Sequence, residues 1–118
     1  VEGIVEMMLD ATQQFSKPLT KDRLFDWHAA LFPTGRSGTH KITVGGWRTI
    51  DAGPMQVVSG PIGKEKVHFE APDADRLEKE MHAFLKWFGN NDDIDPVIKA
   101  GIAHLWFVTI HPFEDGNG

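Results

Sequence analysis

Residues 96–118 read PVIKAGIAHLWFVTIHPFEDGNG, and this stretch decides the fold. A capping residue, Asp95, precedes the proline at its first position, which is a strong signal for the start of a helix. The residues that follow are apolar nearly all round as far as Ile110, so the sequence predicts a helix that is central to the domain. Pro112 ends this helix, and Phe113 is expected to insert back into the core as an anchor for the next turn.

The polar and glycine residues after this helix carry the chemistry. His111 titrates close to neutral pH and therefore suits a base. Asp115 offers the hard oxygen ligand that Mg²⁺ prefers when it also binds phosphates. The glycines of Gly116-Asn117-Gly118 allow backbone N–H groups to point at an anion, and Asn117 is expected either to donate to a phosphate oxygen or to brace the loop. These residues predict phosphate chemistry at the end of a rigid helix.

Residues 1–33 are expected to form the N-terminal helices. Apolar residues from 1 to 15 recur at helical spacing, and Ser16-Lys17-Pro18 interrupts them. Thr20 is a suitable N-cap for a second helix, which should end before Pro33. A loop is expected to follow.

Residues 42–69 predict a loop and a β-hairpin. Glycine and proline are too frequent between residues 42 and 67 for a helix of ordinary length. Two β-prone stretches, 55–58 and 66–69, flank a glycine-rich tip. Helical spacing resumes near residue 72, so residues 72–118 are expected to contain the core helices and the closing motif.

The composition is that of one globular domain. The chain has 118 residues, which is enough for a single core, and 41% of them are hydrophobic. Its net charge of −5 argues against a broad surface for duplex nucleic acid, so no nucleic-acid partner is expected for this chain. It has no cysteine, which excludes disulfides, thiolate metal sites and a cysteine nucleophile. No apolar run has the length of a membrane span, so we expect no membrane partner and a cytoplasmic location.

Residues 111–118 resemble the signature of the Fic (filamentation induced by cAMP) family, His-x-Phe-x-Asp/Glu-Gly-Asn-Gly/Lys-Arg-x-x-Arg. Every specified position up to Gly118 is matched, and the preceding apolar helix also looks like the helix that carries this motif. The resemblance covers the chain from about Leu19 onward. It implies a mainly α fold, a Fic-type helical bundle with a β-hairpin flap, forming a single domain over residues 1–118 that is truncated after the catalytic motif.

The resemblance also implies an activity. Fic proteins typically transfer AMP from ATP to a hydroxyl side chain of a target protein, which makes them nucleotidyltransferases. By this resemblance His111 removes the proton from a target Ser, Thr or Tyr, and Asp115 holds Mg²⁺ between the α- and β-phosphates. Gly116, Asn117 and Gly118 would form the anion hole. The implied co-substrate is ATP, the implied cofactor is Mg²⁺, and the implied partners are a nucleotide and a protein bearing a hydroxyl side chain.

The hairpin at residues 55–69 corresponds by the same resemblance to the flap of Fic proteins. Its edge would pair with an extended segment of the target and present the hydroxyl to His111. The expected contact residues are Gln56, Val57 and Val58. The sequence leaves a homo-oligomer open.

Two parts of the family pattern are not matched in this sequence. The arginines of the signature would follow Gly118, so we expect the fragment alone to bind nucleotide poorly. Many Fic proteins also carry an inhibitory helix whose glutamate blocks the γ-phosphate position. Glu2 lacks the preceding serine or threonine of that pattern, so we interpret it as an ordinary helix residue and expect the inhibitory element before residue 1.

Other conspicuous residues have structural interpretations. The scattered histidines, among them His28, are expected at the surface or at an interface. Residues 35–39 predict a flexible connector, because the lysine and the strand-to-helix context of a phosphate-binding loop are missing.

Two further functions stay open. The same fold is compatible with another phosphate-group transfer or with removal of AMP. The chain is also compatible with a non-catalytic interaction or regulatory domain whose site is vestigial.

Overall fold

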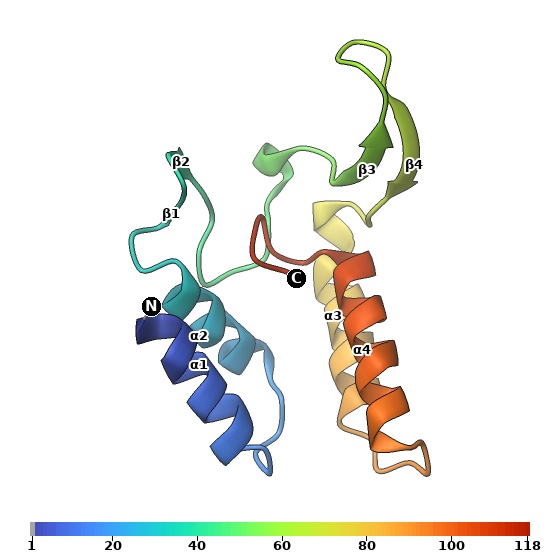
Figure 1. The fold of residues 1–118 in the computed structure, drawn as a ribbon. Coiled ribbons are helices and arrows are strands. Elements are labelled where there is room, and N and C mark those ends of the chain that lie inside the picture. Colours follow the sequence, from blue (N-terminus) through green and yellow to red (C-terminus); the bar gives the residue numbers. More distant parts are fainter. Residues whose placement is uncertain (1) are drawn as a thin grey trace.

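The computed structural model describes residues 2–118, and its helices form two pairs (Figure 1). The first pair is α1 (Glu2–Gln13) with α2 (Lys21–Leu31), and the second is α3 (Leu77–Phe88) with α4 (Pro96–Ile110). The loop that follows α4 lies between the two pairs (Figure 1). The predicted mainly α fold is confirmed, because within the described residues each sheet has only two strands.

The N-terminal helices begin and end close to the predicted positions. Thr20 caps α2, since its Oγ1 accepts from the backbone N–H of Arg23 at 3.2 Å. The helix ends at Leu31, before Pro33, as predicted. The first helix was predicted from residue 1, and Val1 lies outside the described residues.

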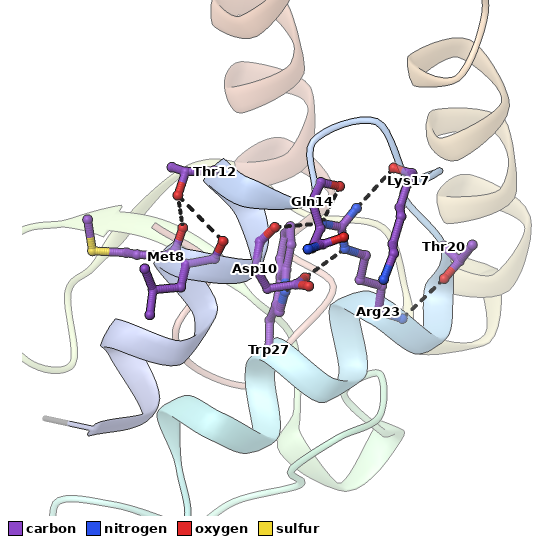
Figure 2. A network of polar contacts seen from close by, with 9 residues as sticks. Met8, Asp10, Thr12, Gln14, Lys17, Thr20, Arg23 and Trp27 are labelled. Atoms are coloured by element: carbon purple, nitrogen blue, oxygen red, sulfur yellow. Dashed lines mark hydrogen bonds and ion pairs between the residues drawn. The ribbon is translucent and has the colours of Figure 1, made fainter.

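Arg23 of α2 caps the end of α1 (Figure 2). Its guanidinium donates to the carbonyls of Asp10, Gln14 and Lys17, each at 3.0 Å. Its Nε and the indole Nε1 of Trp27 both donate to Asp10 Oδ2 at 2.8 Å. These bonds fix the last turn of α1 and the chain that follows it against α2.

The segment between the helix pairs contains two small antiparallel sheets. The predicted connector includes β1 (Arg36–Ser37) paired with β2 (His40–Lys41). A 3₁₀ turn at Ile50–Ala52 follows, and the predicted hairpin is confirmed as β3 (Gln56–Ser59) with β4 (Lys66–Glu70). All residues from 56 to 70 are exposed, and the hairpin extends away from the helices (Figure 1).

The core is centred on α3, which follows a 3₁₀ turn at Ala74–Arg76. Leu77, Met81 and Phe84 recur at four and three residues, so they share one face of the helix and are buried. They form one cluster with buried residues of α2, α4 and the final loop, namely Leu24, Ala103, Ile110 and Phe113. The final loop is therefore part of the core.

Helix α4 is less buried than predicted. Its start is as expected, because Asp95 Oδ1 accepts from the backbone N–H of Val97 at 2.9 Å. Only Ala103 and Ile110 are buried, however, whereas Val97 is 80% exposed and Leu105 is 67% exposed. The prediction that α4 is central on all sides is wrong for the described residues: one face packs against α3 and another apolar face is exposed. Within residues 2–118, no helix combines the length and the apolar character needed to cross a membrane.

Candidate functional site

His111 lies at the C-terminal end of α4 in a left-handed backbone conformation. Its φ and ψ are 52° and 59°, and no other non-glycine residue among residues 2–118 has a positive φ. Its N–H donates to the carbonyl of Phe107 at 2.9 Å and so caps the helix. This conformation costs a residue with a side chain roughly 1–2 kcal/mol, so the surrounding contacts must hold it in place.

Arg48, from the segment between β2 and β3, makes these contacts. It is only 3% exposed. Its Nε donates to the carbonyl of His111 at 2.6 Å and its Nη2 to that of Ile110 at 3.3 Å. Its backbone N–H donates to the carbonyl of Pro112 at 2.8 Å. The sequence did not indicate this role, because an arginine in a loop is usually exposed and no local pattern marks a partner so far along the chain.

His28 of α2 supports the loop after His111. It is 1% exposed, so the predicted surface or interfacial position is wrong. Its ring stacks on Phe113 with 4.1 Å between ring centroids, and its Nε2 lies 2.9 Å from the carbonyl oxygen of Asp115. Its Nδ1 accepts from the backbone N–H of Gly45 at 3.1 Å.

These two partners determine the state of the His28 ring. Because a carbonyl can only accept and a backbone N–H can only donate, the ring is neutral and carries its proton on Nε2. Burial also lowers the pKa of His28, which favours the neutral form. The spacing of four residues between Leu24 and His28 was the signal in the sequence for this burial.

Asn117 and Gly116 shape the glycine loop. The side chain of Asn117 accepts from the N–H of Phe113 at 2.8 Å and donates to the carbonyl of Phe113 at 2.9 Å. Of the two roles expected for this amide, the structure therefore has the bracing one. Gly116 has a φ of 80°, and an added Cβ would lie 2.7 Å from Cε2 of Phe32. Glycine is needed here both for its backbone freedom and for its size.

The carboxylate of Asp115 is exposed and held by two hydrogen bonds. The hydroxyl of Ser37 donates to its Oδ2, and the N–H of Gly116 donates to its Oδ1 at 2.7 Å. These two hydrogen bonds, that of Ser37 first, lower the pKa of Asp115. Residues 35–39 were predicted to be only a flexible connector, but Ser37 contacts the signature directly.

The electrostatic surroundings of His111 favour its neutral form. Burial lowers the pKa of the imidazole below its ordinary value of about 6.5, and the Arg48 guanidinium lowers it further. The carbonyl of Val108 and the charge of Asp115 act in the opposite direction but are weaker. The net shift is downward, so the imidazole is available as a base at pH 7.

A comparison with protein families agrees with this geometry. Residues 18–118 match the model of the Fic/DOC family, and this range is well over half of the chain. The chain belongs to the Fic/DOC family. The resemblance inferred from residues 111–118 is thereby confirmed.

Curated relatives of this Fic domain carry the name of one activity. A protein adenylyltransferase Fic from Nematostella vectensis is 43% identical over 49 residues, which are 40% of this chain and 12% of that protein. The protein adenylyltransferase fic-1 from Caenorhabditis elegans is 27% identical over 81 residues, which are 67% of this chain and 15% of that protein. The matched part of this Fic domain thus spans only a small fraction of the length of these relatives.

Two solved structures share the fold. A Fic domain containing signaling protein from Bacteroides thetaiotaomicron superposes with a TM-score of 0.75 at 24% identity, over 98% of this chain and 40% of that one. A Fic family protein from Desulfovibrio desulfuricans superposes with a TM-score of 0.63 at 26% identity, over 96% of this chain and 32% of that one. The predicted Fic-type fold is confirmed.

The Fic domain places the predicted site residues in two groups. The first group shares the loop after α4 and consists of His111, Phe113, Asp115, Gly116, Asn117 and Gly118. The second group lies on β3 of the exposed hairpin and consists of Gln56, Val57 and Val58. A cleft of about 700 Å³ lies at the base of this hairpin, and its lining includes Met55, Pro72 and Arg48. Arg48 therefore borders both the cleft and the turn at His111.

Proposed function

We propose that the protein containing this chain transfers AMP from ATP to a Ser, Thr or Tyr hydroxyl of a target protein. One observation carries the proposal: His111, whose pKa is lowered by burial, begins a glycine loop that is braced by hydrogen bonds from His28 and within the loop. The names of the relatives from Nematostella vectensis and Caenorhabditis elegans support the same reaction class.

In this reaction His111 is the general base. Its imidazole takes the proton of the target hydroxyl, and the hydroxyl oxygen attacks the α-phosphorus of ATP. The bond from the α-phosphorus to the bridging oxygen breaks, and pyrophosphate leaves. Displacement of this kind depends mainly on positioning and on neutralisation of charge, which the rigid loop is suited to supply.

The loop residues 116–118 are proposed to form the anion hole. The N–H groups of Asn117 and Gly118 bind phosphate oxygens, and Gly116 contributes the left-handed turn that directs them. The N–H of Gly116 itself donates to Asp115 Oδ1, so it stiffens the loop. The amide of Asn117 acts through its bonds to Phe113.

Asp115 is proposed to hold Mg²⁺ at the phosphates. Its carboxylate is exposed, its lowered pKa keeps it ionised, and each oxygen accepts one hydrogen bond, which leaves lone pairs for a metal ion. Within residues 2–118 no group of three or more His, Cys, Asp or Glu side chains could hold a metal ion. Mg²⁺ usually binds through one or two carboxylates together with substrate phosphates, so Asp115 fits this ion. When bound, Mg²⁺ would neutralise charge on the phosphates.

The β3–β4 hairpin is proposed to bind the target as a flap. In the described part of the chain neither outer edge of this two-stranded sheet pairs with another strand. An extended peptide can therefore add to an edge through backbone hydrogen bonds. Val57 and Val58 are exposed on β3 and would contact its side chains, together with Gln56.

Position-specific labels test the proposed reaction. The full-length protein is incubated with Mg²⁺, an extract of cells as the source of target, and ATP labelled on either the α- or the γ-phosphate. We expect the α-label to appear on protein and the γ-label not to appear. Transfer of the γ-label would instead indicate phosphorylation, and release of AMP from pre-labelled protein would indicate the reverse reaction. Absence of any transfer, with the protein folded and nucleotide bound, would favour the non-catalytic alternative.

The rate of transfer should remain high on the acidic side of neutrality. The base must be neutral, and burial followed by the charge of Arg48 lowers the pKa of His111. Activity is therefore complete above this lowered pKa and is lost as the pH falls through it. We expect the acidic limb of kcat/KM, measured across roughly pH 5 to 9, to have its midpoint below about 6.5. A midpoint above that value would contradict a buried base beside a guanidinium.

A further inference from the structure

We propose that Arg48 is a positioning residue for His111, the proposed general base. Its hydrogen bonds hold the backbone turn at His111 and connect this turn to the chain that leaves the β3–β4 hairpin. This inference rests on the proposed role of His111. It concerns a residue outside the signature, in the segment between the two small sheets.

The positive charge of Arg48 is compensated by hydrogen bonds to backbone carbonyls. The side chain is 3% exposed, and in the described part of the chain no carboxylate lies within ion-pair distance of it. A buried charge without compensation is costly. Its partners are instead the carbonyls of Ile110 and His111, at the end of α4. This end of a helix carries a partial negative charge and carbonyls without helical partners, so a guanidinium suits it.

The positions of these bonds constrain the turn at His111. The side chain of Arg48 holds the carbonyls before and after the Cα of His111, at 3.3 and 2.6 Å. The backbone N–H of Arg48 holds the next carbonyl, that of Pro112, at 2.8 Å. Three consecutive peptide groups are therefore bound to one residue. This arrangement holds φ and ψ of His111 in the left-handed region and hence sets the direction of the Cα–Cβ bond from which its imidazole projects.

Arg48 also connects this turn to the hairpin. Its Nη2 donates to the carbonyl of Pro72, which follows the end of β4 by two residues. The base of the hairpin is closed by the N–H of Ala71, which donates to the carbonyl of Met55 at 2.8 Å. One guanidinium thus bonds both to the turn that holds the proposed base and to the chain leaving the proposed flap. The distance between His111 and the β3–β4 hairpin therefore depends on Arg48.

The variant Arg48→Lys tests this inference, because it keeps the positive charge but replaces the planar fork of donors by a single ammonium nitrogen. One nitrogen cannot reproduce the separate bonds that Nε and Nη2 make. The matched control is Arg76→Lys, since Arg76 is exposed and its ion pair within residues 2–118 is with Glu80. We expect Arg48→Lys to lower kcat for AMP transfer by about 10- to 100-fold, as a small displacement of a catalytic group does. The KM for ATP should stay within about twofold, because the glycine loop that would bind phosphate is not altered. The control should retain wild-type values.

A second measurement separates failure of this inference from failure of the proposed function. Imidazole NMR signals of His111, assigned by their loss in His111→Ala, report the orientation of the ring whether or not the protein transfers AMP. In Arg48→Lys we expect these signals to shift or broaden, while those of His104, exposed on the same helix, stay unchanged. Unchanged His111 signals would overturn the inference even if transfer fell. A fall in kcat matched by an equal fall in ATP affinity would also overturn it, as would a fall explained by the unfolded fraction.

Discussion

Replacing His111 with alanine is expected to remove AMP transfer while leaving the domain folded. General-base catalysis typically contributes about 10²–10⁴-fold to a rate, so transfer of the α-label should fall by at least this factor. The residue ends α4 and is only partly buried. Histidine is several-fold more frequent than ordinary residues in the left-handed region, and a preference of that size corresponds to about 1 kcal/mol or less. The melting temperature should therefore change little. Initial rates and thermal unfolding of the same preparations test both parts.

His104→Ala is the control for this substitution. His104 lies on the same helix but is exposed and outside the loop, so its replacement should leave transfer unchanged. Wild-type transfer by His111→Ala would exclude His111 as the base. Loss of transfer in both variants would indicate a general effect on α4 instead of a lost proton acceptor.

Replacing Phe113 with alanine is expected to cause a large loss of stability. Phe113 is 3% exposed and stacks on His28, and its ring also lies near those of Trp47 and Phe107. Removal of a buried phenylalanine ring costs about 3–5 kcal/mol of unfolding free energy. A typical domain has only about 5–15 kcal/mol in total. The loop that follows His111 would lose its anchor, so we expect AMP transfer to fall as well.

Phe15→Ala is the matched control, because Phe15 is 80% exposed. The same chemical change at this position should alter the unfolding free energy by no more than about 0.5 kcal/mol. Urea unfolding followed by tryptophan fluorescence measures both variants. If Phe113→Ala cost less than about 1 kcal/mol, the ring would not be the anchor of the loop, whatever its contacts.

The elements of this fold could be predicted because each depends on a local signal. Asp95 and Pro96 mark the start of α4, and Thr20 marks the start of α2, through contacts within one helical turn. The hairpin follows from two β-prone stretches on either side of a glycine-rich tip. The loop after His111 could also be identified, because its chemistry is contained in eight consecutive residues.

The residues that support the site could not be predicted in the same way. His28 and Arg48 bind backbone groups far along the chain, and no periodicity encodes such a contact. The exposure of α4 was missed for a related reason. Its composition indicates that the helix can be buried on every side, but it does not say which faces are covered within the described residues.

The contact between Phe32 and Gly116 limits how this chain can change over evolutionary time. A Cβ added at residue 116 would lie 2.7 Å from the Phe32 ring, so any residue larger than glycine at this position would clash with that ring. A smaller residue at position 32 would relieve this collision, but a side chain at position 116 would still be strained at a φ of 80°. The residue that directly follows α2 thus adds a limit on size at position 116 to the limit set by the backbone.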